Sequence, residues 1–532
     1  MSQIRENASQ QVLVRDSETE VKYSSPPSGD ISPSRSSTMS RIAPRQSISV
    51  AILCFVNLIN YMDRFTIAGI LEDIQGHFHV TNAEGGLLQT VFIISYMVFA
   101  PLFGYLGDRY SRKWIMAFGV FLWSLTTLLG SFMETFAGFI AMRALVGIGE
   151  ASYSTIAPTL ISDMFTKDLR SIMLAVFYFA IPIGSGLGYI VGSKAAEAAG
   201  AWQWALRVTP VLGVVAVILI SIVLFDPPRG HSEGTHQLQA TSWSQDLSAL
   251  VSNTSFVLGT LGFTCVAFVA GALAWWGPTF VTYGLKLQLG AENADMKDVS
   301  FIFGVIAMLA GLFGVSLGVV SATRLRVRFP RADPLVCAAG LLISAPLMFL
   351  GAVVTEYSVV WAYVLFFFGQ VFLNLNWSIV ADMLLYVVVP TRRSTAEALQ
   401  ILMSHLLGDA GSPYLVGVVS DALLVYLSSS GSSTDVDSSA GSADGGSEDS
   451  SAMLLVKFQS LQYALFITVF VEVLGGLFFL LNAMYIVRDR DRAQRMATGF
   501  SGEISAIAEV PTSNIFADQP SNFPEQTHAL LT

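Results

Sequence analysis

Twelve apolar segments, each long enough to span a lipid bilayer, constrain what this chain of 532 residues can fold into. A helix crosses the hydrocarbon core of a bilayer with about 20 apolar residues. Only 13% of the residues are charged, whereas roughly a quarter are charged in soluble domains. The sequence therefore predicts an all-α membrane protein. The predicted spans are 48–71, 86–107, 114–133, 136–162, 171–193, 205–225, 256–283, 300–322, 335–354, 358–389, 396–425 and 460–487.

A polar linker, 226–255, divides the predicted spans into two sets of six. Internal repetition of this kind is typical of transporters whose substrate site lies between the repeats, near the middle of the membrane. We therefore expect an N-terminal six-helix bundle at 48–225 and a C-terminal six-helix bundle at 256–487. The remaining segments are predicted to be a disordered tail at 1–47, a disordered Ser/Gly/Asp-rich loop at 428–451 and a second tail at 488–532.

Basic residues are distributed unequally between the two membrane faces. Most of the 29 Lys and Arg residues fall in the tails or in the loops after the second, fourth, sixth, eighth and tenth spans. Loops rich in Lys and Arg stay in the cytosol. Both termini are therefore predicted to be cytosolic, and the loop 428–451 is predicted to face a lumen or the outside.

Several classes of function lack support in the sequence. Cys54, Cys265 and Cys337 all lie in apolar segments and form neither a disulfide framework nor a metal-binding spacing. No basic stretch interleaved with aromatic residues suggests a nucleic-acid partner. Because no P-loop or nucleophile constellation occurs, we do not expect an enzyme. The polar segment 1–47 predicts no cleavable signal peptide.

The loop 104–113, GYLGDRYSRK, connects the second and third spans and is densely charged. It resembles the loop motif of the major facilitator superfamily, except for Ser111 where that motif prefers Gly. A degenerate second copy at 314–330 lacks the Asp-Arg pair. The resemblance implies two rocking bundles and a gating loop formed by Gly104, Asp108, Arg109, Arg112 and Lys113.

The first span carries polar side chains where lipid-facing residues would be apolar. Ionisable groups inside a span are costly and tend to face a cavity or a partner. Asn57, Asn60 and Arg64 share one helical face, and a guanidinium matches the geometry of phosphate. We predict that Arg64, with Asn60 beside it, binds an anionic headgroup. Asp63 is a candidate for proton coupling, although an Asp63–Arg64 pair that only locks helix packing is an alternative.

The fourth span contains a second polar face, within RALVGIGEASYS. Arg143, Gly147 and Glu150 lie on this face. Gly147 permits close packing, and Arg143 joins the candidate substrate-binding residues. Packing does not explain a carboxyl at mid-depth, so Glu150 is predicted to carry a proton.

Two other spans carry structural signals. The fifth span contains Pro182 and glycines at 184, 186 and 188, which predict a kinked helix that slides against a neighbour. Flexible packing without a role in coupling explains the same residues. Trp275 and Trp276, in the seventh span, are predicted to lie in an interfacial aromatic belt, with a substrate-lining role as the alternative.

The tenth and eleventh spans supply the polar residues of the second half. Asn376 lies inside the tenth span and is a candidate for substrate binding. His405 is the only histidine within a span, and Asp409 follows at i+4 on the same face. Because histidine titrates near pH 6.5, the two residues form a candidate proton relay, although a lone histidine also serves to hydrogen-bond a neighbouring helix.

Several stretches from about 57 to 415 resemble the spinster family, among them NLINYMDRFTIAG, GEASYSTIAPTLISDMF and SHLLGDAGSPYL. The resemblance implies proton-dependent movement of lysophospholipids, such as lysophosphatidylcholine and lysophosphatidylethanolamine, from the lysosome or late endosome to the cytosol. It also implies that a proton gradient and no cofactor or metal drives transport, and that Arg64, Glu150 and His405 are the substrate and proton residues. Gln370 departs from the family, where relatives usually carry Glu.

Other functions remain open at this point. Some relatives export sphingosine-1-phosphate across the plasma membrane, and a phosphate would again suit Arg64. A carrier of small polar anions is disfavoured by the few charges in the predicted cavity. A membrane sensor or scaffold that transports nothing is the alternative from another class, and the charges inside the spans argue against it. In each case the bilayer and a lipid or small solute are the expected partners, and we expect a monomer.

Overall fold

All regular secondary structure in the described part of the chain is helical. The structure is a computed structural model that describes residues 43–165, 167–227, 243–288, 294–389, 392–431 and 445–508, and the chain from Pro44 onward forms one unit. The N-terminal half comprises α1 (Pro44–Gly69), α2 (Leu71–Phe78), α3 (Asn82–Arg109), α4 (Arg112–Gly130), α5 (Phe136–Met164), α6 (Lys167–Ala199), the short 3-10 helix η1 (Trp202–Trp204) and α7 (Ala205–Ile222).

The C-terminal half is preceded by α8 (Trp243–Val251), which lies in the predicted linker. The half itself comprises α9 (Thr254–Lys286), α10 (Met296–Arg326), α11 (Ala332–Val354), α12 (Val359–Asn374), α13 (Asn376–Val387), α14 (Arg393–Ser404), the π-helical turn η3 (His405–Asp409), α15 (Gly411–Gly431) and α16 (Gly445–Ala508).

Each of the twelve predicted spans falls on helix. Eleven helical stretches of the described chain are long and apolar enough to cross a membrane. The twelfth, α5, is 29 residues long and is less apolar because it contains Arg143 and Glu150. The predicted all-α membrane fold is therefore confirmed.

The boundaries differ from prediction in three places. The span predicted at 358–389 is divided at Leu375, whose amide bonds to Phe372, three residues back. The span predicted at 396–425 is interrupted by η3. α16 begins at Gly445, inside the segment predicted to be disordered, and continues to Ala508, beyond the predicted end at 487. The remainder of that predicted loop, 432–444, and the tail segments 1–42 and 509–532 lie outside the described residues.

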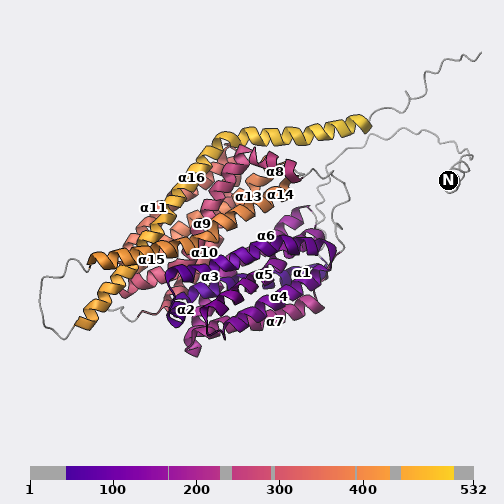
Figure 1. Cartoon of the computed structure of the whole chain (residues 1–532). Helices are drawn as coiled ribbons and strands as arrows, with labels where there is room; N and C mark the ends of the chain where they lie inside the picture. Colours follow the sequence, from indigo (N-terminus) through magenta and orange to yellow (C-terminus); the bar gives the residue numbers. More distant parts are fainter. Residues whose placement is uncertain are drawn as a thin grey trace, which may run out of the picture. The chain divides into compact units, whose positions relative to one another are not determined.

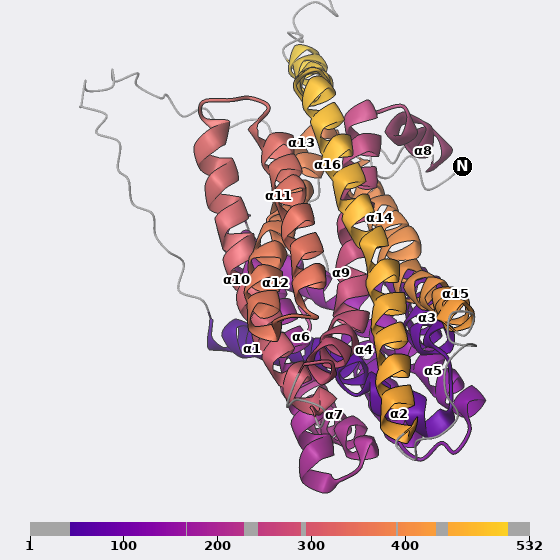
Figure 2. The ribbon, with the colours of Figure 1, turned by 90° about the vertical axis from the view of Figure 1, so that its left-hand side faces the viewer.

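The helices group by half, as Figure 1 and Figure 2 show. In the N-terminal half, α1 packs against α6, and α5 packs against α3 and α4. In the C-terminal half, α16 packs against α9 and α11, and α12 against α10 and α11. The most extensive contacts between the halves are those of α3 with α15 and of α6 with α10.

Small residues permit the close approach of α6 and α10. A Cβ atom added to Gly186 would lie 2.6 Å from the carbonyl oxygen of Gly304, and one added to Gly304 would lie 2.6 Å from that of Gly186. Such separations exclude a side chain at either position. One glycine of the predicted sliding face therefore lies at the interface between the halves.

Two membrane faces are distinguished below by their residues. The basic face carries Arg112, Arg326 and Arg392, where α4 begins, α10 ends and α14 begins. The opposite face carries Asn82, Lys286 and Asp421, near the start of α3, the end of α9 and the middle of α15. The polar residues of the candidate site lie between these faces.

Candidate functional site

Arg64 and Glu150 form an ion pair inside the N-terminal half. The Nη2 atom of Arg64, on α1, lies 3.1 Å from Oε2 of Glu150, on α5. The side chains are 9% and 0% exposed. Sequence analysis identified both residues separately, and the fold makes them partners. When one partner of a buried ion pair is lost or neutralised, the other charge is left unpaired and the protein is strongly destabilised.

Asp63 does not pair with Arg64. Thr127 Oγ1, on α4, donates to Asp63 Oδ2 at 3.1 Å, and the hydroxyl of Thr209, on α7, donates to Oδ1. Arg143 Nη1, on α5, lies 4.0 Å from Oδ2. Asp63 thus links α1 to three other helices, and the alternative of an Asp63–Arg64 pair is wrong.

Several polar atoms of this cluster are buried without a hydrogen-bond partner among the described residues. They are Nε of Arg64, Oε1 of Glu150, Nε and Nη2 of Arg143, and both amide atoms of Asn60. Buried polar groups are nearly always satisfied by protein, water or ligand. The cluster can therefore accept an anionic group at the guanidinium ions, beside a carboxyl able to hold a proton.

Aromatic rings enclose the Arg64 guanidinium. Its central carbon lies 4.9 Å from the ring centres of Tyr61 and Phe92 and 5.6 Å from that of Tyr96. Phe92 also lies 4.7 Å from the guanidinium carbon of Arg143. The ring faces stabilise both cations and restrict the directions from which a ligand can reach them.

His405 and Asp409 pair as predicted, in the C-terminal half. Nδ1 of His405 lies 2.9 Å from Oδ1 and 3.1 Å from Oδ2 of Asp409. Both belong to η3, where Gly408 departs from helical geometry (φ −93°, ψ −105°). Single π-helical turns are frequent at functional sites. The side chains are 28% and 20% exposed, so the pair is not sealed inside the protein.

Tyr96 connects the two halves of the site. Its ring lies edge-on to the His405 ring, with centres 6.2 Å apart, and it also contacts Arg64. Arg64, on α1, and His405, in η3, are therefore brought together around one aromatic side chain of α3.

Asn376 lies elsewhere. Its amide nitrogen donates to the Leu373 carbonyl oxygen at 2.9 Å, and it lies beside Gly340 of α11. The structure places Asn376 in the packing of the C-terminal half and does not group it with Arg64. Asn57 behaves similarly, since it donates to the Phe177 carbonyl oxygen at 3.0 Å.

Arg112 is the centre of the predicted gating loop. Its guanidinium contacts Asp163 at the end of α5, Asp226 after α7 at 3.0 Å and the carbonyl oxygen of Pro227 at 2.7 Å. These contacts tie the start of α4 to helix ends of its own half. They stabilise the N-terminal half as one body, which is a prerequisite for moving it as a unit.

The other loop residues have separate environments. Arg109 is exposed and stacks on Tyr105 at 4.3 Å, and Lys113 is half-buried. A Cβ on Gly104 would meet nothing within 4 Å, whereas one on Gly107 would lie 3.0 Å from Ile156 of α5. The close helix approach therefore occurs at Gly107. Asp108 lies at the end of α3, and its side chain is outside the described part of the structure.

The second copy of the loop repeats this design with different residues. Arg326 pairs with Asp333 at 3.0 Å and with Asp382 at 3.4 Å. These carboxylates lie at the start of α11 and on α13. An arginine on the basic face thus ties helix ends together in each half.

The two halves are joined by polar contacts near the opposite face. Backbone amides of Asn82 and Ala83, in the first turn of α3, donate to the Asp421 carboxylate at 3.1 and 2.7 Å. Lys286 pairs with Glu72 at 2.9 Å. These contacts must break if the halves are to separate on that face.

The tryptophans of α9 also lie at this junction. Trp275 donates to the Gly85 carbonyl oxygen at 3.2 Å and Trp276 to that of Pro413 at 2.9 Å, and both are buried. The prediction of an interfacial aromatic belt is therefore wrong. Hydropathy could not distinguish a tryptophan at the membrane surface from one between helices.

Comparisons with known proteins agree over most of the chain. A family model described as Major Facilitator Superfamily matches residues 53–412. Protein spinster of Drosophila melanogaster is 60% identical over 497 residues, covering 88% of this chain and 81% of the relative. Protein spinster homolog 1 of Homo sapiens is 52% identical over 472 residues, covering 86% and 84%.

Solved structures share the fold at lower identity. A bacterial homolog to the human lysosomal transporter spinster, in an inward-facing and unoccupied conformation, matches with a TM-score of 0.72. It is 19% identical, and the match covers 84% of this chain and 98% of that one. A D-xylose-proton symporter matches with a TM-score of 0.61 at 16% identity, over 81% and 97%.

Proposed function

This chain belongs to the spinster family of the major facilitator superfamily, and we propose that this membrane transporter moves lysophospholipids from the lysosome to the cytosol in a proton-dependent way. Lysophosphatidylcholine and lysophosphatidylethanolamine are the proposed substrates. The observation that carries the proposal is the dry Arg64–Glu150 pair with unsatisfied polar atoms on both partners.

A phosphodiester suits this site because guanidinium binds phosphate oxygens through paired hydrogen bonds. In the substrate-free arrangement the Glu150 carboxylate pairs with the Arg64 guanidinium. A proton on Glu150 removes the charge that holds the pair together and releases the guanidinium for the phosphate. Loss of the proton restores the pair and expels the lipid headgroup, so substrate and proton binding are linked at two neighbouring side chains.

The coupling requires a change in the arrangement of the halves. A proton shifts a conformational equilibrium only if the two states bind it with different affinity. The His405–Asp409 pair and the Arg64–Glu150 pair lie on different halves and meet at Tyr96. Movement of the halves changes the surroundings of both pairs, and this provides the differential affinity that alternating access requires.

The proposed function also includes the membrane in which the protein lies and its orientation there. The bacterial structure is described as a homolog of a human lysosomal transporter, and the human relative shares 52% of its aligned residues with this chain. We place the chain in lysosomal or late endosomal membranes, as a monomer with both termini and the basic face in the cytosol. The plasma membrane is the alternative location.

The test is uptake of labelled lipids by proteoliposomes with and without an imposed pH gradient. We expect gradient-dependent flux of lysophosphatidylcholine. Arg64→Ala removes the proposed phosphate-binding group and Glu150→Gln the proposed proton-binding group. Because a hydrogen bond to a charged group contributes about 1.5–3 kcal/mol, each should reduce flux by more than about tenfold, while Arg331→Ala, which removes an exposed arginine, should not. Absence of lysophospholipid flux in correctly folded protein would contradict the proposal.

Sphingosine-1-phosphate is the second candidate substrate. Its phosphate would use the same guanidinium, and its single chain resembles that of a lysophospholipid. The same vesicles distinguish the two lipids. Flux of sphingosine-1-phosphate alone, indifferent to the pH gradient, would assign the protein to export of that lipid and leave Glu150 and His405 as structural residues.

A further inference from the structure

Glu472 is a buried carboxyl that the proposed transport mechanism does not use. It lies on α16 and is 0% exposed, and its Oε2 atom has no hydrogen-bond partner in the described chain. No basic side chain among the described residues pairs with it. Glu472 was not among the residues predicted from the sequence. A lone Glu within the apolar run 460–487 was the signal that could have indicated it.

The helices packed against α16 offer no countercharge. α9, α11, α13 and α15 surround it. They carry the thiols Cys265 and Cys337 and the exposed Tyr414. Their charged groups are engaged elsewhere: Lys286 with Glu72, Asp333 and Asp382 with Arg326, and Asp421 with the start of α3.

A single hydroxyl hydrogen defines the state of this carboxyl. Ser344 Oγ, on α11, lies 2.9 Å from the Gly369 carbonyl oxygen, on α12, and 3.0 Å from Glu472 Oε1. A carbonyl oxygen only accepts, and a serine hydroxyl has one hydrogen to donate. If Ser344 donates to Gly369, the second contact needs a hydrogen from Glu472. A protonated Glu472 satisfies both contacts, whereas a carboxylate would compete with the carbonyl for one hydrogen.

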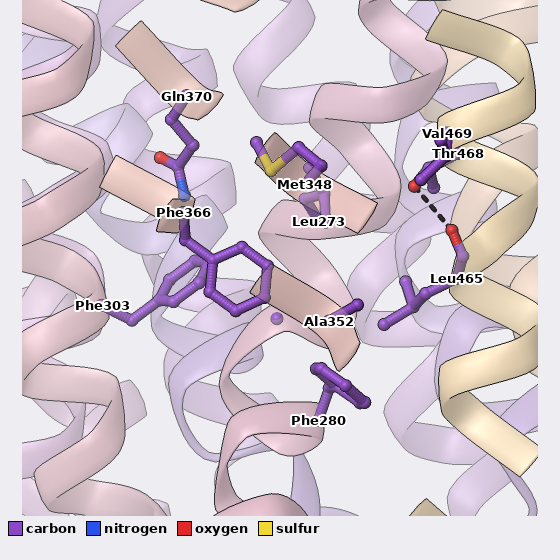
Figure 3. A pocket seen from close by; sticks show the side chains of 11 residues that line it. Leu273, Phe280, Phe303, Met348, Ala352, Phe366, Gln370, Leu465, Thr468 and Val469 are labelled. Atoms are coloured by element: carbon purple, nitrogen blue, oxygen red, sulfur yellow. Dashed lines mark hydrogen bonds between the residues drawn. The ribbon is translucent and has the colours of Figure 1, made fainter. Parts of the chain in front are cut away.

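A cavity adjoins this chain of hydrogen bonds. It is small, with room for about one water molecule, and is lined mainly by apolar side chains of α9, α10, α11, α12 and α16. Figure 3 shows Gln370, Met348 and Thr468 on its wall. Gln370 follows Gly369 directly, and Met348 and Thr468 lie one helical turn from Ser344 and Glu472, so each is close to one of the three hydrogen-bonded residues.

The cavity lies between Glu472 and the opposite face. α16 enters the membrane from that face, so Leu465 and Thr468, which line the cavity, precede Glu472 along the helix. Phe280, at the other end of the cavity in Figure 3, lies toward the end of α9 at the same face. A single water molecule beside Thr468 would lie within about one helical turn of the carboxyl.

We propose that Glu472 is a second proton-binding site, separate from the Arg64–Glu150 pair and located beside this cavity. With its proton, Glu472 links α11, α12 and α16 through Ser344. Without it, the link is lost and the charge has to be hydrated from the cavity. The inference goes beyond the proposed function, because it requires neither a lipid substrate nor transport.

Infrared difference spectroscopy of the full chain in lipid nanodiscs tests the proposal. Spectra recorded between about pH 5 and pH 8, the range that separates acidic organelles from cytosol, report carbonyl bands of carboxylic acids that gain or lose a proton. We expect one such band to disappear in Glu472→Gln and to persist in Glu150→Gln. In Ser344→Ala the same band should shift in frequency, because its hydrogen-bond partner is gone.

Two results would overturn the inference. One is a set of titrating bands that is unchanged in Glu472→Gln. The other is a Glu472 band that is present at every pH, which would make the residue a permanently neutral link between helices. If Glu472→Gln does not fold, the test rests on Ser344→Ala. In that case, if no titrating carbonyl band shifts in frequency in Ser344→Ala, Glu472 is not a proton-binding site. None of these readouts depends on lipid transport, so a failure of the proposed substrate would leave the result unaffected.

Discussion

Asp421 clamps the two halves together at the opposite face, and its removal should favour opening there. Its carboxylate accepts hydrogen bonds from the amides of Asn82 and Ala83 at 3.1 and 2.7 Å. These amides have no partners within their own helix, since they belong to its first turn. The positive end of the helix dipole adds to the attraction. The contact exists only when α15 lies against the start of α3.

Asp421→Asn preserves the shape of this side chain and removes its charge. An amide can accept with one oxygen only, so one of the two charge-assisted bonds is lost. Such a bond contributes about 1.5–3 kcal/mol, and the lower value applies because the side chain is only partly buried. A loss of about 1.5 kcal/mol changes an equilibrium roughly tenfold. The state opened at this face should become about ten times more populated.

Labelling of a cysteine at position 90 measures that population. Thr90 lies on α3, and its hydroxyl donates to the Ala410 carbonyl oxygen across the junction. The three native cysteines are first replaced, and Thr90→Cys is then labelled with a membrane-impermeant maleimide in vesicles that expose the opposite face. Adding Asp421→Asn should accelerate labelling about tenfold, in proportion to the open population.

Asp295→Asn is the matched control. Asp295 is a carboxylate on the same face, but it accepts from the Lys297 amide within its own half. Its replacement should leave the labelling rate of Thr90→Cys unchanged. An unchanged rate in Asp421→Asn, or an equal increase in the control, would refute the assignment of Asp421 as the clamp.

Three further predictions concern stability. Burial raises the pKa of Asp73, in α2, above its ordinary value of 3.8, against the opposing charge of Lys297. The folded state therefore binds this proton more tightly than the unfolded chain, and the protein loses stability as pH rises through the raised pKa. Asp73→Asn removes the titrating group, so the fall in melting temperature with rising pH should be smaller in this variant than in the wild type. Gly186→Ala should lower stability by about 1–3 kcal/mol through overpacking, whereas Gly76→Ala, where a Cβ meets nothing within 4 Å, should not, as measured by thermal unfolding in detergent. Arg112→Ala leaves two partly buried carboxylates without their cation and should cost about 2 kcal/mol, while loss of the exposed Arg109 in the same assay should cost less than about 0.5 kcal/mol.

The helices could be predicted from the sequence because the signal is local. A run of about 20 apolar residues has to span the membrane as a helix, since no other conformation of a single segment satisfies its backbone there. The same reasoning identified Arg64, Glu150 and His405, because a charged or titratable group in such a run is costly wherever it lies. The His405–Asp409 pair was predictable for a related reason: residues at i and i+4 are neighbours on any helix.

Partners on different helices could not be predicted from spacing. Arg64 and Glu150 are distant in sequence, and only the packing of α1 near α5 brings them together. Asp63 and Arg64 are adjacent but point in different directions, since neighbours at i and i+1 do not face each other on a helix. Each therefore meets a different side chain of α5. For the same reason the sequence did not show that Asn376 lies against α11, or that Asp421 reaches across to α3.

The π-helical turn places the His405–Asp409 pair close along the backbone to the junction between the halves. His405 and Asp409 lie within the turn, and its closing bond runs from the Ala410 amide to the His405 carbonyl oxygen at 3.0 Å. Two carbonyl oxygens after the turn accept hydrogen bonds: that of Ala410 from Thr90 of the other half, and that of Pro413 from Trp276 of the same half. Under the proposed proton coupling, a proton gained or lost by this pair would act on an already irregular turn, and α15, which follows it, packs against α3. The helices α14 and α15, with η3 between them, thus connect the proposed proton-binding pair to the clamp at Asp421 through continuous backbone.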